Sequence, residues 1–308
     1  MTPPAAQMSP FEIVLLIGLA LVWGGSFVFA EVALEALPPL TVVLIRVGLG
    51  AITILAVVLA LGKRLPTHAG DWGRLAVMSV LNNVIPFSLI VWGQTQITAS
   101  LASILNAATP IFALLVAHVV TADERISANK MAGVLLGFAG VAILIGPAAL
   151  FGEATVLGQL AVLGAALSYG CAAAWGRRLA GLEPMVVAAG QLTVSTLLML
   201  PLAFLVERPL SYPMPAGEVI ASLVALATLS TAFAYIMFFR ILRGAGAINV
   251  SLVTLLVPVS AIGLGAVWLG EVLTVRQVVG AAIIAAALVV IDGRLLRRGA
   301  LGTRGVAQ

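Results

Sequence analysis

Polar side chains at helical spacing inside long apolar segments are the groups in this chain that could do chemistry. The pattern Ser-x-x-[Asn/Thr]-x-x-x-Pro occurs twice, at Ser103, Asn106, Pro110 and at Ser251, Thr254, Pro258. Residues at i, i+3 and i+7 lie on one face of a helix. Each proline lacks an N–H and frees the carbonyl of Asn106 or Thr254, four residues earlier. An ordinary proline kink is the alternative, but two matched cases favour a binding cavity beside broken helices.

Further polar and aromatic residues suit the same cavity. Asn82 and Asn83 adjoin one another in the third apolar segment, where hydrogen bonding between helices is their alternative use. In the first segment Trp23 precedes Gly24 and Gly25, which permit bending or close approach. The side chains expected to contact a solute are Trp23, Ser79, Asn82, Asn83, Trp92, Ser103, Asn106, Tyr169, Thr231, Tyr235, Ser251 and Thr254. The expected hinges and gates are Gly24, Gly25, Pro86, Pro110, Pro258, Glu124 and Glu271.

Membrane helices must position these side chains. Of the 308 residues 62% are hydrophobic and 9% are charged, and the mean hydropathy is +1.17. Soluble chains are about 45–50% apolar and about 25% charged, and a helix needs about 20 apolar residues to cross a bilayer. Ten such segments are predicted, at about 11–30, 39–61, 72–94, 98–120, 128–147, 157–176, 185–206, 217–240, 246–269 and 275–293. The fold class is therefore all-α integral membrane, with the lipid bilayer as a partner.

The excess of basic residues is a topology signal. The net charge is +4 and the pI is about 9.8. If the N-terminus is cytosolic, 13 of the 16 Lys and Arg residues fall in the inside loops and the C-terminal tail, as the positive-inside rule requires. We expect cytosolic N- and C-termini and no nucleic-acid partner. Residues 1–11 lack Lys and Arg, so the first segment is expected to be a membrane helix and no signal peptide. Trp92 fits either a cavity wall or the membrane interface.

Matches along the chain predict an internal repeat. An offset of 147 aligns Glu124 with Glu271 and Gly133 with Gly280, and nearby offsets align the other segments in the same order. The repeats are expected to span 1–149, with helices 1–5, and 150–308, with helices 6–10 and a short basic cytosolic tail. Since five is odd, the second repeat enters the membrane from the opposite side. Inverted-topology repeats are common in secondary transporters, with the site near the midplane between them.

The matched segments DERISANKMAG (123–133) and GEVLTVRQVVG (270–280) have two interpretations. Ser127 and Thr274 are natural helix N-caps, and Thr274 with Gln277 forms a capping box. Alternatively, Glu124 at the cytosolic face and Glu271 at the periplasmic face form gates. Each carboxylate would then pair with a nearby cation when its own side is closed.

Several function classes lack the residues they need. No GxxxxGK[ST] phosphate loop, HExxH motif or metal cluster occurs, since the histidines His68 and His118 stand alone. Cys171 is the single cysteine. No cofactor and no enzymatic activity are expected. The acids lie in loops or near helix ends, which disfavours a cation-drug antiporter, and Arg46 alone is too little charge for a phosphorylated substrate. The remaining cavity suits a neutral or zwitterionic solute with an apolar side chain.

The stretch LALVWGGSFVFAEVALEALPP, Arg46 after it, the proline-bearing helices 4 and 9, and Glu-x-[IL]-[ST] before each last helix resemble the EamA-type drug/metabolite transporter superfamily. The resemblance covers about residues 12–293. The stretch SVLNNVIPFSLIVWGQTQITASLASILNAATPIFALL is similar to bacterial YddG-type aromatic amino-acid exporters. It implies a bacterial inner (plasma) membrane protein, a ten-helix inverted repeat, and a central cavity between helices 1, 3, 4, 6, 8 and 9.

The resemblance further implies export of aromatic and other neutral amino acids, and of compounds such as methyl viologen. Alternating access around Asn82, Asn83, Asn106 and Thr254 is the expected mechanism, and the protein is expected to be a monomer. Proton coupling and facilitated diffusion both remain open, because no acid lies mid-membrane. The alternatives are export of a sugar phosphate, a nucleotide sugar or a cationic compound, and a non-transport scaffold or receptor.

Overall fold

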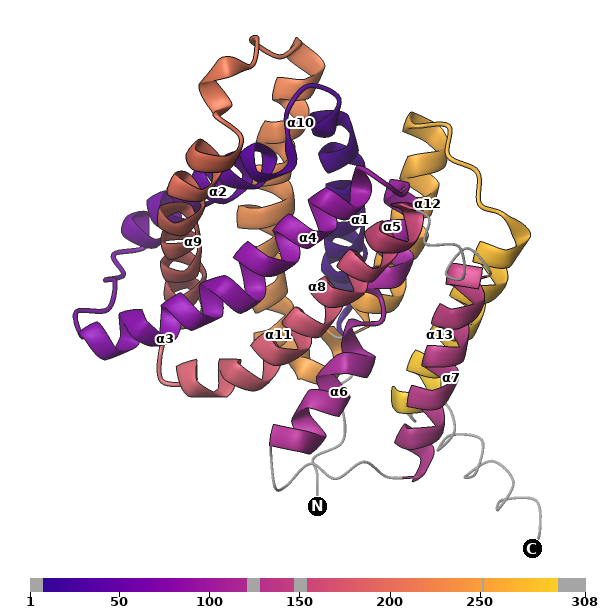
Figure 1. The fold of residues 1–308 in the computed structure, drawn as a ribbon. Helices are drawn as coiled ribbons and strands as arrows, with labels where there is room; N and C mark the ends of the chain where they lie inside the picture. Colours follow the sequence, from indigo (N-terminus) through magenta and orange to yellow (C-terminus); the bar gives the residue numbers. More distant parts are fainter. Residues whose placement is uncertain (1–7, 121–127, 147–153, 251, 293–308) are drawn as a thin grey trace, which may run out of the picture.

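The computed structural model describes residues 8–120, 128–146, 154–250 and 252–292, and this part of the chain holds helices and no strand (Figure 1). Before residue 147 the helices are α1 Pro10–Leu34, α2 Pro39–Ala60, α3 Ala69–Ser79, α4 Ile85–Gln94, α5 Ala99–Asn106, α6 Thr109–Val120 and α7 Ala128–Ile145. After residue 153 they are α8 Ala154–Gly176, α9 Pro184–Val206, α10 Gly217–Ala227, α11 Ala234–Val250, α12 Val253–Trp268 and α13 Val275–Asp292. Two π-helical turns, η1 Val80–Val84 and η5 Thr228–Phe233, join α3 to α4 and α10 to α11. Short 3-10 turns follow α8 and α9, at η3 Arg177–Leu179 and η4 Pro209–Ser211.

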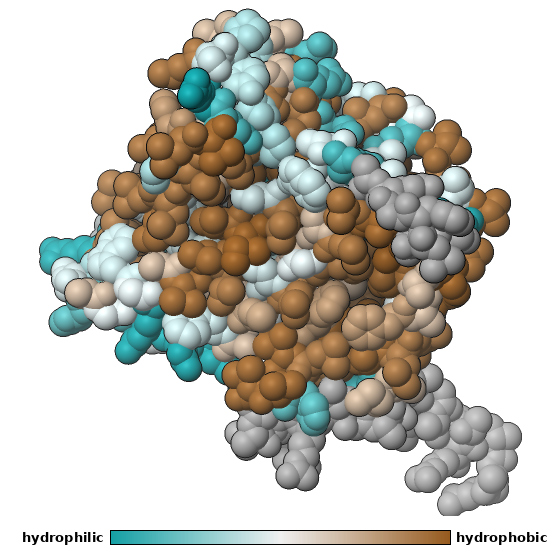
Figure 2. Space-filling view, in the orientation of Figure 1, coloured by the Kyte–Doolittle hydropathy of each residue, from teal (hydrophilic) through white to brown (hydrophobic). Residues whose placement is uncertain are grey.

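Among the residues that the structure describes, seven helical stretches are long and apolar enough to cross a membrane. They are Pro10–Leu34, Pro39–Ala60, Ala69–Gln94, Ala99–Val120, Thr155–Leu179, Pro184–Val206 and Gly217–Gly246. The other three predicted segments coincide with shorter apolar helices, Lys130–Ile145, Val253–Trp268 and Val275–Ile291. In Figure 2 apolar side chains cover the broad middle of the visible face, and hydrophilic ones gather toward its upper and lower left ends. The predicted all-α membrane class is confirmed, and the count of ten crossings stays a prediction.

Local chemistry sets where several helices begin. At α1, Ser9 accepts from the backbone N–H of Glu12, whose carboxylate accepts in return from the N–H of Ser9 at 2.8 Å. Prolines occupy the first position of α2 and α9, Pro39 and Pro184, where the missing N–H costs no helical bond. The Thr98 hydroxyl caps α5. These starts lie within one residue of the predicted ones.

The interiors of four predicted segments differ from continuous α-helices. The third and eighth contain η1 and η5, whose first residues Val80 and Thr228 stand 148 positions apart. The fourth breaks between α5 and α6, because Pro110, the second residue of α6, gives no N–H to the helix before it. Gly246 interrupts α11 with a φ of 81°, and the ninth helix begins at Val253 instead of 246.

The main helix pairings join the two parts of the chain. α1 packs on α12 and α10, α2 on α9, both α4 and α6 on α8, and α7 on α13. Each pair combines a helix before residue 147 with one after residue 153. In Figure 1, α7 and α13 lie side by side at the edge of the bundle. Because the interior forms between the two parts, any central cavity must be lined by both.

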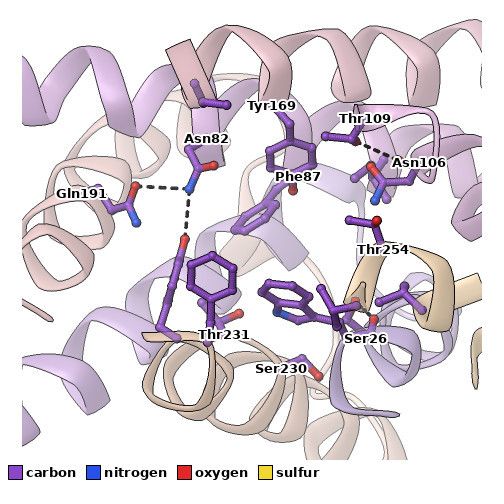
Figure 3. A pocket seen from close by; sticks show the side chains of 18 of the residues that line it. Ser26, Asn82, Phe87, Asn106, Thr109, Tyr169, Gln191, Ser230, Thr231 and Thr254 are labelled. Atoms are coloured by element: carbon purple, nitrogen blue, oxygen red, sulfur yellow. Dashed lines mark hydrogen bonds between the residues drawn. The ribbon is translucent and has the colours of Figure 1, made fainter. Parts of the chain in front are cut away.

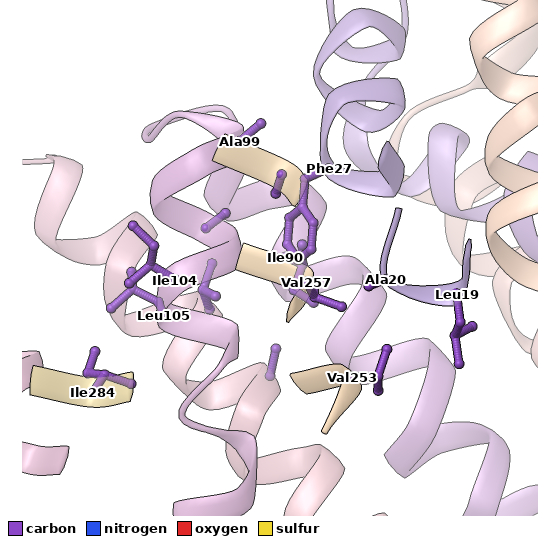
Figure 4. Close-up of a cluster of buried hydrophobic side chains, with 14 of the residues drawn as sticks. Leu19, Ala20, Phe27, Ile90, Ala99, Ile104, Leu105, Val253, Val257 and Ile284 are labelled. Carbon is purple, nitrogen blue, oxygen red and sulfur yellow. The ribbon is translucent and has the colours of Figure 1, made fainter. Parts of the chain in front are cut away.

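Small residues and buried apolar side chains hold these pairs together. Figure 4 shows one cluster, in which Leu19, Ile104 and Ile284 come from different helices. On α7, a Cβ at Gly140 would lie 2.9 Å from a carbon of Ile284 on α13, so only glycine allows this approach. Gly133 extends the same contact toward Ile291, whereas Gly137 mainly faces Ile111 on α6. In membranes such small residues let helix backbones come close, and here they do so within one chain.

α2 and α9 are also joined at both ends by polar contacts. The Glu207 carboxylate accepts from the backbone N–H groups of Leu40 and Thr41, at 2.9 and 2.7 Å. At the opposite end Lys63 pairs with Glu183. A carboxylate at a helix N-terminus satisfies N–H groups that lack a helical acceptor. These contacts fix the register of α2, which carries Arg46, against α9.

Candidate functional site

A cavity of about 820 Å³ lies between the two parts of the chain. Residues of α1, α2, α3, α4, α5, α6, α8, α9, α11 and α12 line it, together with η1, η3 and η5. At one end it reaches the turn between α8 and α9, with Leu182 and Pro184, and at the other it reaches Ala30 and Gln94. Ligand cavities typically enclose about 300–1,000 Å³. This one has room for a small metabolite.

One side of the cavity, here called the amide wall, is formed by Asn82, Gln191 and Tyr235 (Figure 3). The Asn82 amide donates to the Gln191 side-chain oxygen at 3.3 Å and to the Tyr235 hydroxyl at 3.1 Å. That hydroxyl donates to Asn83 at 3.3 Å, and Asn83 donates to Ser195 at 3.0 Å. The π turn η1 therefore directs the side chains of both asparagines toward protein partners. An asparagine that faced lipid instead would lack a hydrogen-bond partner.

Across the cavity Asn106, Thr109 and Thr254 form what we call the break wall (Figure 3). The Thr109 hydroxyl donates to the Asn106 carbonyl at 2.7 Å. The prediction that proline leaves this carbonyl open is therefore wrong, because the threonine beside Pro110 occupies it. The Asn106 side-chain oxygen is buried and has no hydrogen-bond partner among the described residues. Pro258 lies inside α12 and lines the cavity as well.

Aromatic rings occupy the space between these walls. The Trp23 and Phe238 ring centroids are 5.7 Å apart, and Tyr235 stacks on Phe239 at 6.0 Å with an interplanar angle of 13°. Ser230 on η5 donates to the Val22 carbonyl at 2.8 Å and thereby joins η5 to α1. Such ring faces can stack on aromatic solutes.

Arg46 brings the only charge among the described residues that line the cavity. Its side chain is 7% exposed. The Nε donates to the Thr231 hydroxyl at 3.1 Å, and Cζ lies 3.7 Å from the centre of the Phe87 ring. Among the described residues no carboxylate pairs with it and none accepts from its two terminal nitrogens. A buried cation in a membrane helix without an anion is costly and points to function.

The structure places the predicted solute-contact residues in three groups. On the cavity lining lie Trp23, Asn82, Ser103, Asn106, Tyr169, Thr231, Tyr235 and Thr254. Away from it lie Ser79, Asn83 and Trp92. Ser79 is fully buried and donates to the Leu75 and Gln191 carbonyls, whereas Trp92 is 42% exposed on the outside. Ser251 lies outside the described residues.

The predicted hinges and gates divide in a similar way. A Cβ at Gly24 would lie 2.1 Å from the Ser260 hydroxyl oxygen, so this glycine serves close approach of α1 to α12. Gly25, Pro86 and Pro110 lie off the cavity lining, and Glu124 lies outside the described residues.

The expected cation partner of Glu271 is absent from the described residues. The Glu271 carboxylate instead accepts from the N–H groups of Ala99 and Ser100, at 2.7 and 2.9 Å, and so caps α5. The predicted capping box of Thr274 and Gln277 is present. Glu271 therefore joins the α12–α13 turn to the N-terminus of α5, near the end of the cavity opposite the α8–α9 turn.

The predicted site left out five polar residues of the lining, Ser26, Gln94, Thr109, Gln191 and Ser230. Arg46 was noticed in the sequence but likewise left out of the site. Gln191 and Arg46 each stand inside an otherwise apolar segment, and polar residues there are commonly functional. That rule identifies Gln191 and Arg46 as candidates, but it does not tell which face of a helix lines a cavity.

Comparisons with known proteins agree with this architecture. The sequence model of the EamA-like transporter family matches residues 10–146 and again residues 156–292. The "Uncharacterized transporter YoaV" of Bacillus subtilis is 25% identical over 280 residues, 87% of this chain and 92% of its own length. "Protein PecM" of Dickeya dadantii is 27% identical over 88% of this chain and 89% of its own. The "Probable terminal-alkyne amino-acid exporter" of Streptantibioticus cattleyicolor is 26% identical over 90% and 91%.

A solved crystal structure supports the fold. It is 22% identical in sequence, covers 93% of this chain and 98% of its own, and superimposes with a TM-score of 0.67. The double match to one family, the relatives aligned along most of their length and the membrane-type bundle around a central cavity agree with one another. The chain belongs to the EamA-like transporter family.

Proposed function

We propose that this protein is a secondary transporter that exports amino acids, aromatic and other neutral ones, by alternating access around the central cavity. The observation that carries the proposal is the lining itself, with amides and hydroxyls on two walls, ring faces between them and one cation. A zwitterion with an apolar side chain complements each of these parts. The relative named an amino-acid exporter supports the same substrate class.

The proposed membrane arrangement has ten crossings in two inverted repeats, with both termini in the cytosol of a bacterium and the chain in its inner membrane as a monomer. Two family matches of similar length, one per half, support the repeat. So do the matched positions of η1 and η5. In this orientation the α8–α9 turn, where the cavity ends, faces the cytosol. Ala180 beside that turn is exposed, whereas Ala30 and Gln94 at the other end are buried, which favours a conformation that loads substrate from inside.

The other substrate classes fit less well. A sugar phosphate or a nucleotide sugar carries two or more negative charges, and Arg46 is the one cation on the described lining. A cationic drug would need a carboxylate on the lining, and none is found there among the described residues. Phenylalanine or tryptophan, by contrast, gains ring stacking worth about 0.5–1.5 kcal/mol beyond burial of its area.

Uptake of labelled phenylalanine and threonine into proteoliposomes tests the proposal. We expect saturable uptake without a pH gradient, reduced in Asn82→Ala and Asn106→Ala, which remove one amide from each wall. Ser211→Ala, on the exposed turn η4, is the control and should transport normally. Absence of uptake with or without a gradient would overturn the amino-acid proposal.

The pH gradient in the same assay decides coupling. Uptake that requires the gradient would overturn facilitated diffusion and direct attention to Glu31 on α1. Its carboxylate accepts at 2.9 Å from Gln94, which lines the cavity. Glu31→Gln would then abolish the gradient dependence. Facilitated diffusion predicts that Glu31→Gln leaves uptake unchanged.

A further inference from the structure

The Arg46 guanidinium is held in a fixed orientation, but no anionic group among the described residues pairs with it. Its side chain is more than nine-tenths buried, its Nε is held by Thr231, and its plane is backed by the Phe87 ring. Thr231 is itself fixed, since its hydroxyl donates to the Leu226 carbonyl at 2.9 Å. The orientation is therefore set before any ligand arrives, while the two terminal nitrogens keep their donors free of protein acceptors in the described residues.

A guanidinium held by its Nε offers two parallel N–H groups at its far side. That fork matches the two oxygens of a carboxylate, and the pair forms two charge-assisted hydrogen bonds. In a lining that excludes most water, the attraction is stronger than at a surface. Since no acid lines the described cavity, nothing in it competes with an incoming anion.

The lining offers no comparable partner for an ammonium group. The oxygens that face the cavity belong to amides and hydroxyls, which are neutral. The Gln191 and Tyr235 oxygens already accept from Asn82, and the Asn106 side-chain oxygen, which has no partner among the described residues, is a neutral acceptor. A positively charged ligand without a carboxylate would also meet the like charge of Arg46. The cavity therefore offers a charged partner to the carboxylate of a zwitterion but none to its ammonium group.

We propose that Arg46, positioned by Thr231 and Phe87, binds the carboxylate of the transported solute, and that the carboxylate rather than the amino group is the feature required. The inference rests on the proposed function and defines its substrate class by the carboxylate. The solutes are apolar or aromatic monocarboxylates, with or without an α-amino group. Aromatic amines that lack the carboxylate are excluded.

Three probes of equal ring size separate the contributions. Phenylalanine carries both charges, 3-phenylpropanoate only the carboxylate, and 2-phenylethylamine only the ammonium. Binding of each to the purified full-length protein in detergent, measured by calorimetry, does not depend on transport. We expect 3-phenylpropanoate to bind about as tightly as phenylalanine, and 2-phenylethylamine at least about tenfold more weakly, the loss expected with a hydrogen bond to a charged group.

Substitutions at Arg46 locate the effect. Arg46→Gln should weaken phenylalanine and 3-phenylpropanoate binding about tenfold or more, whereas 2-phenylethylamine, relieved of the like charge, should bind at least as tightly as before. Arg46→Lys keeps the charge but not the fork and should recover part of the loss. Arg240→Gln removes the same charge from an exposed position on α11 outside the lining and should leave all three affinities unchanged. If Arg46→Gln fails to fold, the affinities of the three probes for the unchanged protein still show whether the carboxylate is required.

The outcomes separate this inference from the proposed function. If 2-phenylethylamine binds as tightly as phenylalanine, the carboxylate role is overturned even if phenylalanine is transported. If 3-phenylpropanoate binding depends on Arg46 but phenylalanine is not transported, the carboxylate site stands and amino-acid export falls. If none of the three probes binds, the inference is overturned.

Discussion

Arg46 and Gln191 occupy corresponding places in two different helices but differ in charge and in hydrogen bonding. Each stands seven residues after the proline that begins its helix, Pro39 in α2 and Pro184 in α9. Each contacts a π turn, since Gln191 accepts from Asn82 on η1 and Arg46 donates to Thr231 on η5. The backbone plan is the same on both sides, but only one side carries a charge.

The surroundings differ as much as the two side chains do. Next to η1, α9 supplies the Ser195 hydroxyl, which accepts from Asn83 at 3.0 Å. Next to η5, α2 supplies Gly50, where a Cβ would lie 3.2 Å from the Thr231 methyl carbon. The α9 side is thus an internally hydrogen-bonded network, and the α2 side leaves donors for a ligand. Matching helix starts and matching π turns therefore surround two different sets of contacts, a hydrogen-bonded network beside α9 and unpaired donors beside α2.

The largest effect on stability is expected at Asn83, within the network. Asn83→Ala removes one hydrogen bond to Ser195 and one from Tyr235, both inside the bundle. At about 0.6–1.5 kcal/mol for each bond, the loss is about 1–3 kcal/mol. Thermal unfolding in detergent measures it. Ser88→Ala, which removes only a 3.9 Å contact with the Met199 sulfur, should cost much less. Equal melting temperatures for the two variants would contradict the view that the hydrogen-bonded network beside α9 stabilises the fold.

A smaller effect on stability, but a clear one on affinity, is expected at Thr231. Thr231→Val keeps the shape and removes the oxygen that holds Arg46. Carboxylate affinity should fall about three- to tenfold, as for loss of one neutral hydrogen bond, while the free energy of unfolding falls by about 1–2 kcal/mol, because the bonds to Arg46 and to the Leu226 carbonyl are both lost. Thr228→Val in the same turn, whose hydroxyl donates to Val224 and lies off the lining, is the control. Identical carboxylate affinities in the two variants would show that Thr231 does not orient Arg46.

The smallest effects are expected where Glu207 and Glu271 cap the N-termini of α2 and α5. Glu207→Gln and Glu271→Gln each keep one acceptor and lose the charge, at about 0.3–1 kcal/mol. Because α2 carries Arg46, only Glu207→Gln should also alter carboxylate affinity. A changed transport rate in Glu271→Gln with unchanged affinity would support its role as a gate. An unchanged rate would leave it a helix cap.

The helical membrane class could be predicted because the apolar length of each segment is a direct physical demand of the bilayer. Pro39 and Pro184 marked helix starts correctly, since proline is tolerated at the first position. The π turns could not be foreseen from residue types. A helix widens there because neighbours such as Ser195 and Tyr235 satisfy the side chains that the extra residue turns inward.

The candidate site was harder, because polarity shows that a residue avoids lipid but not what it faces instead. Asn82 and Asn83 are identical and adjacent, yet one lines the cavity and the other packs between helices. Ser79 likewise binds helices together. Arg46 was set aside because one charge seemed too little for a phosphate, although it is the right amount for a carboxylate.

The contact between Ser260 and Ala20 has a consequence for biosynthesis. The Ser260 hydroxyl donates to the Ala20 carbonyl at 2.6 Å. The two residues are 240 positions apart in the sequence, and they lie where α1 and α12 pack closely. A ribosome adding about 5–20 residues per second takes about 10–50 s to cover that distance. During this interval α1 is already made, while Gly24 still lacks the Ser260 side chain that it approaches in the finished fold. The contact between α1 and α12 therefore forms only near the end of synthesis.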